Sequence, residues 1–258
     1  MVVATKTEAS LAATITQTSF ANALKTAFTS AGYSAIFDDY TSGTDRILVY
    51  AHVIDNSKVY GTSYLRIRIT SALLIYQQIY STWNATAHTG TGSSTEVLMV
   101  TFATNIAISF ISLDIGIEGR LVLITQGALY APLGIITPAN RPTWWDLNSW
   151  NYGFIFTSNS ANILRGTTVN PYTNNDYDTF LNNSRLGTPN TTYNGRDILT
   201  GIALLSQSST GVACRTSDDF GIGSCNGNAR YDLLPIAGTT QQFLVVNNVS
   251  GGLVIRVQ

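Results

Sequence analysis

Charged residues are scarce in this sequence, and their shortage argues against several classes of protein. Asp, Glu, Lys and Arg make up 11% of the 258 residues, less than half the usual proportion. The 14 Lys and Arg nearly balance the 15 Asp and Glu, and no lysine follows Lys58. An electrostatic nucleic-acid-binding protein needs a basic patch, which this composition does not supply. Disorder is excluded because 45% of the residues are hydrophobic and the net charge is −1.

Groups suited to acid–base or nucleotide chemistry are also few. His52 lies in an apolar run that reads as a strand, and His88 stands beside the Gly/Thr-rich loop 89–94, where we expect it to be exposed. No G-x-S-x-G sequence marks a serine nucleophile. The glycine motifs at 90–92 and 221–223 lack the third glycine of a dinucleotide site and the lysine of a P-loop. We therefore predict a protein that is not an enzyme and binds no cofactor.

Only two cysteines occur, Cys214 and Cys225, and they enclose a loop-like run of 12 residues. A disulfide across such a loop contributes roughly 2–3 kcal/mol, and we predict that the two lie close enough to bridge. Two reduced thiols are the alternative, and the spacing is not that of a zinc site. Asp176 and Asp178 lie in an Asn-rich loop whose oxygens suit calcium, but the EF-hand pattern is absent and turn formation accounts for the cluster. No metal site is predicted.

A membrane span is not expected. The nearest approach is the uncharged run of 17 residues from 97 to 113, whereas a transmembrane helix needs about 20 mostly apolar residues. The run contains Thr, Asn and Ser and many β-branched residues, so it predicts two buried strands and no membrane insertion. The first residues lack the basic and apolar segments of a secretory signal, which leads us to expect synthesis in the cytoplasm.

Hydrophobic periodicity predicts an α+β fold. Phe20, Leu24 and Phe28 recur at helical spacing, between a cap at 18 or 19 and Gly32, and predict a helix over 19–31. Apolar residues from Ala72 to Trp83 predict a second helix by the same criterion. Strands are predicted at 35–40, 46–54, 64–70, 97–103, 106–113 and 121–130. Residues 1–140 therefore read as an α+β assembly domain with a mostly antiparallel sheet and two helices.

Composition changes near residues 137–142, and we place a domain boundary there. Residues 141–258 are predicted to be a Trp/Asn-rich region of β-strands and loops. Its most distinctive segment contains residue types that anchor protein interfaces or stack on sugars, namely Trp144, Trp145, Trp150 and Tyr152. An interface or a small aromatic core is preferred there over a glycan contact. The closing hairpin at 243–257 offers an apolar strand for pairing with a neighbouring copy.

The Ser-, Thr- and Asn-rich strands, the scarce lysine, the missing signal sequence and the Trp/Asn-rich second half resemble bacteriophage virion proteins of the tail, baseplate or fibre. Ser, Thr and Asn together supply 77 residues. The resemblance concerns composition and element pattern over the whole chain and carries over no functional residue. It implies a non-enzymatic structural component of the virion, made in the host cytoplasm, whose partners are copies of itself and other virion proteins. Two alternatives remain: a receptor- or glycan-binding adhesin that contacts a host surface glycan, and a hydrolase of polysaccharide or peptidoglycan.

Overall fold

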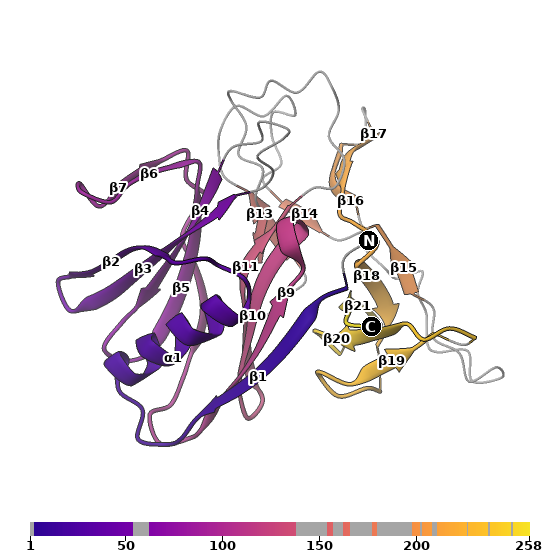
Figure 1. Cartoon of the computed structure of the whole chain (residues 1–258), viewed down its shortest axis with the longest axis horizontal. Coiled ribbons are helices and arrows are strands. Elements are labelled where there is room, and N and C mark those ends of the chain that lie inside the picture. Colours follow the sequence, from indigo (N-terminus) through magenta and orange to yellow (C-terminus); the bar gives the residue numbers. More distant parts are fainter. Residues whose placement is uncertain are drawn as a thin grey trace.

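The computed structural model describes residues 3–53, 62–137, 154–156, 162–165, 177–179, 198–201, 203–207, 211–225, 227–236, 238–248 and 250–258. These residues form mostly strands, and every strand pair among them is antiparallel. Figure 1 shows three sheets side by side, which we name the N-terminal, central and C-terminal sheets.

The N-terminal sheet has five strands. In spatial order they are β2 (Ile36–Ser42), β3 (Asp45–Val53), β4 (Thr62–Ile69), β5 (Leu74–Tyr80) and β8 (Val97–Thr101). The short hairpin of β6 (Thr82–Asn84) and β7 (Thr89–Thr91) follows β5. Trp83 from this hairpin packs with Ile47 and Val49 of β3, while Leu48 and Tyr50 belong to the main core. β3 is therefore buried on both faces, which explains its continuous apolar sequence.

The central sheet has seven strands. In spatial order they are β1 (Thr5–Leu11), β9 (Ile108–Asp114), β10 (Gly119–Gln126), β11 (Leu129–Ile136), β12 (Phe154–Phe156), β13 (Asn162–Arg165) and β14 (Tyr177–Thr179). A short 3₁₀ helix, η1 (Gly116–Glu118), connects β9 to β10. β10 and β11 share one hydrophobic core with residues of both neighbouring sheets, and most of their side chains are buried.

The C-terminal sheet contains β15 (Ile198–Thr200), β18 (Phe220–Ser224), β21 (Ser250–Arg256), β20 (Gln242–Val245) and β19 (Leu233–Pro235), in that order. A separate hairpin joins β16 (Ala203–Gln207) to β17 (Gly211–Arg215). The predicted closing hairpin is confirmed as β20–β21. The expectation that it offers a free strand to a neighbouring copy is wrong, because β18 flanks β21 and β19 flanks β20.

The predicted first helix is confirmed as α1 (Gln17–Ser30). Its cap is Thr16, two or three residues before the predicted cap at 18 or 19, and the side chain of Thr16 accepts a hydrogen bond from the backbone N–H of Ser19 at 3.1 Å. Phe20, Leu24 and Phe28 are fully buried in the main core. The apolar stripe thus predicted the helix correctly. Its exact start depends on the hydrogen bonds of the cap, which the stripe does not indicate.

The predicted second helix is wrong, because residues 74–80 form strand β5. Ile75, Gln77 and Ile79 are buried and the residues between them are partly exposed, which is the alternation of a strand. The alternation was not recognised in the sequence because Gln77, a polar residue, occupies one of the buried positions. Its Nε2 donates to the carbonyl oxygen of Phe156 at 2.8 Å, so the amide is satisfied inside the core.

The α+β class is likewise wrong, because α1 is the one α-helix among the described residues and strands make up most of the rest. The strand predicted at 121–130 is in fact the hairpin of β10 and β11, which turns at Gly127 with a φ of +57°. The domain boundary near residue 140 stays a prediction. Phe220 and Ile255 of the C-terminal sheet nevertheless lie in the same core cluster as β9, β10 and β11.

Candidate functional site

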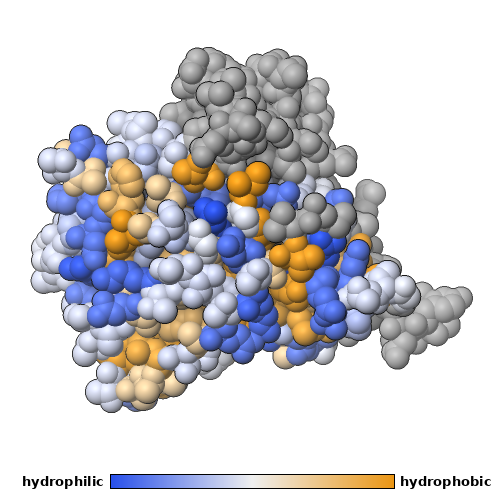
Figure 2. All heavy atoms as spheres, viewed as in Figure 1, coloured by the Kyte–Doolittle hydropathy of each residue, from blue (hydrophilic) through white to orange (hydrophobic). Residues whose placement is uncertain are grey.

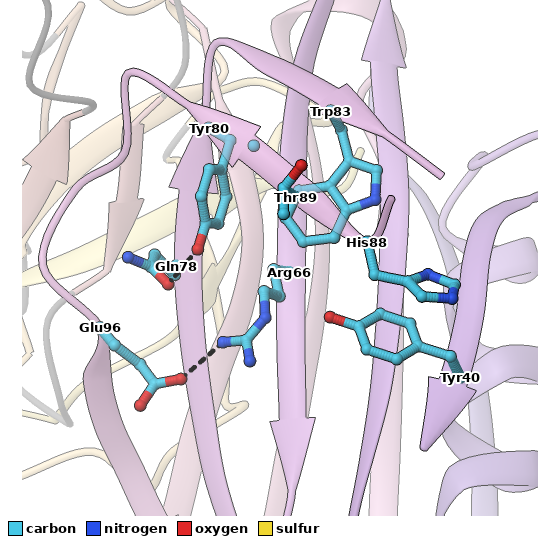
Figure 3. Close-up of a pocket in the computed structure, with 9 residues that line it drawn as sticks. Tyr40, Arg66, Gln78, Tyr80, Trp83, His88, Thr89 and Glu96 are labelled. Carbon is cyan, nitrogen blue, oxygen red and sulfur yellow. Dashed lines mark hydrogen bonds and ion pairs between the residues drawn. The ribbon is translucent and has the colours of Figure 1, made fainter. Parts of the chain in front are cut away.

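An open cleft lies on the outer face of the N-terminal sheet, beneath the β6–β7 hairpin. Its volume is about 450 Å³, within the range of roughly 300–1,000 Å³ that is typical of small-molecule sites. Figure 3 shows Arg66 in the middle of the cleft, with the rings of Tyr40, Tyr80 and Trp83 around it. The lining thus combines aromatic rings with polar side chains, and we name it the aromatic–arginine cleft.

Strand alternation brings these side chains to one face. In β4, Leu65 and Ile67 are buried in the core, so Arg66 between them points to the opposite face. In β5 the same alternation exposes Gln78 and Tyr80. The antiparallel register places Arg66 directly opposite Gln78. Cross-strand neighbours on one face of a sheet lie within contact distance, and the cleft floor is built from such neighbours.

Ion pairs fix the polar side of the cleft. Arg66 Nη1 donates to Glu96 Oε1 at 2.7 Å, and Arg68 binds both carboxylate oxygens of Glu96. Arg68 also donates to Asp45 Oδ2 at 2.9 Å and lies over the ring of Tyr76. Burial alone favours a neutral Glu96, but the hydrogen bonds from Arg68 and Arg66 outweigh it and hold the pKa of Glu96 below its usual range.

The aromatic side is equally constrained. Tyr80 meets Trp83 edge to face, with ring centroids 4.9 Å apart. The Tyr80 hydroxyl donates to Gln78 Oε1 at 2.7 Å, and Gln78 Nε2 donates to the carbonyl oxygen of Ser94. A Cβ atom at Gly90 would lie 2.4 Å from Tyr80 Cδ1 and 2.7 Å from Trp83 Cε3. Only glycine therefore lets β7 lie against both rings.

A buried carboxylate, Asp38 of β2, ties the hairpin to the sheet. Asp38 Oδ2 accepts a hydrogen bond from Trp83 Nε1 at 2.8 Å and lies 2.9 Å from His88 Nδ1. The His88 ring stacks on Tyr40 with centroids 4.0 Å apart. In Figure 3 its ring nitrogens lie on the side away from Arg66 and Tyr80. Asp38 thus positions the aromatic walls, and His88, which also lines the cleft, is held between Asp38 and Tyr40.

The two histidines occupy the environments that the sequence predicted. His52 is fully buried in β3, and burial, reinforced by the charge of Arg120, lowers its pKa to about 3. His88 is 44% exposed. Sequence reasoning did not foresee the contacts of His88 with Asp38 and Tyr40, since β2 and the β6–β7 hairpin are about 50 residues apart in the chain.

A second buried ion pair links the carboxyl-terminal strand to the loop before β18. Arg256 Nη2 lies 2.7 Å from Asp219 Oδ1, and both side chains are almost wholly buried. Burial, together with the adjacent Asp219, raises the pKa of Glu118 in η1. Asp219, which follows Asp218 in the sequence, therefore has Arg256 as a partner within the fold. This cluster joins the central and C-terminal sheets.

The other sequence-predicted residues fall largely outside the described part of the chain. This holds for Trp144, Trp145, Trp150, Tyr152 and Asp176. Asp178 lies in strand β14. Cys214 lies in β17 and Cys225 just after β18, but only the side chain of Cys225 is described; it is buried, with Sγ 3.9 Å from the carbonyl oxygen of Gly252. The predicted proximity of the cysteines stays a prediction.

The comparisons with protein families and with curated proteins identify no relative of this chain. No protein-family model matches the chain, and no curated protein matches its sequence. Within the ranges given above, no three or more His, Cys, Asp or Glu side chains gather where they would hold a metal ion. No helix in the described part of the chain has the length and apolar character needed to cross a bilayer.

The sequence did contain a signal for the cleft. Eight of the charged residues in the described part of the chain lie in α1 and the N-terminal sheet or immediately beside it: Lys25, Asp38, Asp39, Asp45, Arg46, Arg66, Arg68 and Glu96. Reading residues 74–80 as a strand would have aligned Tyr76, Gln78 and Tyr80 with Arg66 and Arg68 on one face. The helix prediction hid that alignment.

Proposed function

We propose that this protein is a non-enzymatic structural component of a virus particle, in the tail or baseplate, which acts by assembling into a multimer. The proposal extends the resemblance in composition to virion proteins. It rests on one structural observation, the uncharged and partly apolar surface of residues 97–137.

That segment exposes large apolar side chains where a charged surface would be usual. It contains only three charged residues, Asp114, Glu118 and Arg120. Four of its apolar side chains, at separate places, are 43–49% exposed: Leu98 of β8, Ile106 before β9, Ile117 of η1 and Leu129 at the start of β11. Figure 2 shows apolar surface lying open between hydrophilic stretches on the face in view. Interface cores are depleted in charge in the same way, which supports a surface that is covered on assembly.

Strand β1 is the contact between copies that we propose. It ends the central sheet as described, with β9 on one side. If two β1 strands paired antiparallel about Thr7, Lys6 of each copy would lie opposite Glu8 of the other. Opposite charges placed directly across a strand pair stabilise it, and a two-fold axis makes both contacts at once.

Light scattering of the purified chain and fractionation of virus particles test the proposal. We expect a multimer at micromolar concentration and recovery of the chain in particles. Thr7→Glu would set two carboxylates against each other on the two-fold axis and weaken association, whereas Thr5→Glu, on the same exposed strand, would face Ala9 and have a smaller effect. A stable monomer that is absent from particles would overturn the proposal.

A second candidate function is that of an adhesin that binds a receptor or glycan, and the aromatic–arginine cleft favours it. The hydrolase alternative receives less support from that cleft. Cleavage of a glycosidic bond ordinarily uses a pair of carboxyl groups, one of them as a proton donor. Glu96 is the one carboxylate lining this cleft, and its two arginine partners keep it ionised.

A further inference from the structure

We infer that the aromatic–arginine cleft is a binding site for a neutral saccharide. The inference rests on the second candidate function, surface recognition, and is independent of multimer formation. It assigns roles to described residues: Tyr80, supported by the buried Trp83, contacts the apolar face of a sugar ring, and Arg66, Glu96 and Gln78 bind its hydroxyl groups.

The shape of a sugar ring matches the two-sided lining of the cleft. A pyranose ring presents C–H groups on its face and hydroxyl groups around its edge, so its site needs an aromatic surface beside hydrogen-bonding groups. Tyr80 supplies ring surface above the sheet and Trp83, only 9% exposed, packs against it, while Figure 3 shows the polar groups of Arg66, Gln78 and Glu96 on the adjoining side. Tyr and Trp combine large apolar area with few rotatable bonds, so holding them in place costs little entropy.

The ion pair of Arg66 and Glu96 suits neighbouring hydroxyl groups. Each hydroxyl both donates and accepts a hydrogen bond. A guanidinium carries five N–H donors and an ionised carboxylate has about four acceptor positions, so a pair of the two can bind further groups. Glu96 Oε1 already accepts from Arg66 Nη1 and Arg68 Nε, and Oε2 accepts from Arg68 Nη2, so one acceptor position remains on Oε2 for a hydroxyl, beside the other N–H donors of Arg66.

Charge balance selects a neutral ligand. Arg66 and Arg68 are matched by Glu96 and Asp45, all within one connected network. A phosphate or sulfate group in the cleft would lie near Glu96, and an ammonium group would lie near Arg66. Neither charge would find an unopposed partner among these residues, whereas hydroxyl groups bind both members of the pair without desolvating a ligand charge.

The cleft is preorganised, as a binding site requires. Asp38, only 8% exposed, holds Trp83 and lies within hydrogen-bond distance of His88, while Gly90 lets the hairpin pack against the rings. A surface network of ion pairs contributes little to stability. Fixing these side chains before binding instead reduces the ordering cost that a ligand must overcome.

A glycan array followed by titration calorimetry tests the inference on the full chain. The probes are neutral oligosaccharides of glucose, galactose, mannose and N-acetylhexosamines, with sialylated and sulfated glycans included for comparison. We expect binding to at least one neutral glycan. Tyr80→Ala should weaken that binding at least tenfold, and Tyr80→Phe should weaken it less because the ring remains.

Phe37→Ala is the matched control. Phe37 is an exposed aromatic residue of the same sheet that contacts Tyr64 and does not line the cleft, so its removal should leave glycan affinity unchanged. Glu96→Gln is a second variant that removes the carboxylate and keeps the shape, and it should also weaken binding at least tenfold. Circular dichroism confirms that each variant is folded.

Three results would overturn the inference. These are no binding of any neutral probe at millimolar concentration, binding of anionic glycans alone, and binding that survives both Tyr80→Ala and Glu96→Gln. Light scattering of the same samples separates this outcome from failure of the assembly proposal, because a multimer without glycan binding would leave that proposal intact.

Discussion

The outer face of the N-terminal sheet and the segment 97–137 differ in how they use the chain's few charged residues. The first carries Arg66, Arg68, Asp45 and Glu96 in a single hydrogen-bonded network. The second has three charged residues in 41 positions and leaves Ile106 and Leu129 nearly half exposed. Charges placed together on one face favour recognition of a polar ligand, while a surface without them favours contact with protein. Because β8 and its exposed Leu98, opposite Tyr76, belong to the N-terminal sheet, the contrast and the two proposed roles concern that outer face and residues 102–137.

The largest effect on stability is expected from the interior of the second region. Leu123 is fully buried in β10, and Leu123→Ala should lower the free energy of unfolding by about 2–5 kcal/mol. Arg66→Ala, in the half-buried β4, should cost far less. Urea denaturation measures both, and equal losses would contradict the view that β10 lies at the centre of the core.

A pH effect is expected from the inner side of the N-terminal sheet. His52 is neutral when buried, with a pKa of about 3, whereas in the unfolded chain it binds a proton near pH 6.5. Stability from this group is present above pH 6.5 and is lost as the pH falls towards 3. Between pH 7 and about pH 4.5 the loss should be roughly 2–3 kcal/mol.

His52→Phe removes this titration and is the control for it. The variant should show a smaller loss of stability over the same pH range, measured by urea denaturation at each pH. Carboxylate titration is common to both proteins, so the difference between them reports His52. An identical pH dependence in the two proteins would show that His52 does not carry the effect.

The ion-pair network should matter more to binding than to stability. Glu96→Gln removes the shared partner of Arg66 and Arg68 on a partly exposed surface, so we expect it to cost no more than about 1 kcal/mol of stability. Thermal denaturation checks this. A loss of several kcal/mol would mean that the network holds the sheet together, which would weaken the comparison between the two surfaces.

The smallest effect on stability is expected at the apolar surface of the second region. Leu129 is 46% exposed, and Leu129→Lys should change the free energy of unfolding by less than about 0.5 kcal/mol. If this surface lies in an intersubunit contact, the same change should shift the multimer towards smaller species in light scattering. If the mass of the multimer is the same for Leu129→Lys and the unaltered protein, Leu129 does not lie in the proposed contact.

Local sequence pattern predicted part of this fold. The spacing of Phe20, Leu24 and Phe28 identified α1, and the alternation of Leu65, Ile67 and Ile69 identified β4. Both are amphipathic elements whose period is visible within about ten residues. The prediction for β5 failed because Gln77 occupies a core position and is satisfied by Phe156, which is 79 residues away. No local pattern contains that partner.

The residues of the cleft are also brought together by contacts between segments that are far apart in the sequence. The sequence identified His88 as exposed, but its position follows from Asp38 and Tyr40 of β2. Glu96 became part of the site only when the loop before β8 met Arg66 and Arg68 of β4. Glu96, Arg66 and Arg68 did not stand out individually in the sequence, because Arg and Glu are common residues at protein surfaces.

By itself the sequence determined the scarcity of charge, the amphipathic helix α1 and strands β2, β3, β4, β8 and β9, because composition and periodicity are local properties of the chain. The tertiary structure alone decided that residues 74–80 are a strand, that the closing hairpin lies inside a sheet, and that Arg66, Glu96, Tyr80 and Trp83 line one cleft. These features arise from antiparallel pairing between distant segments, whose register fixes which side chains share a face.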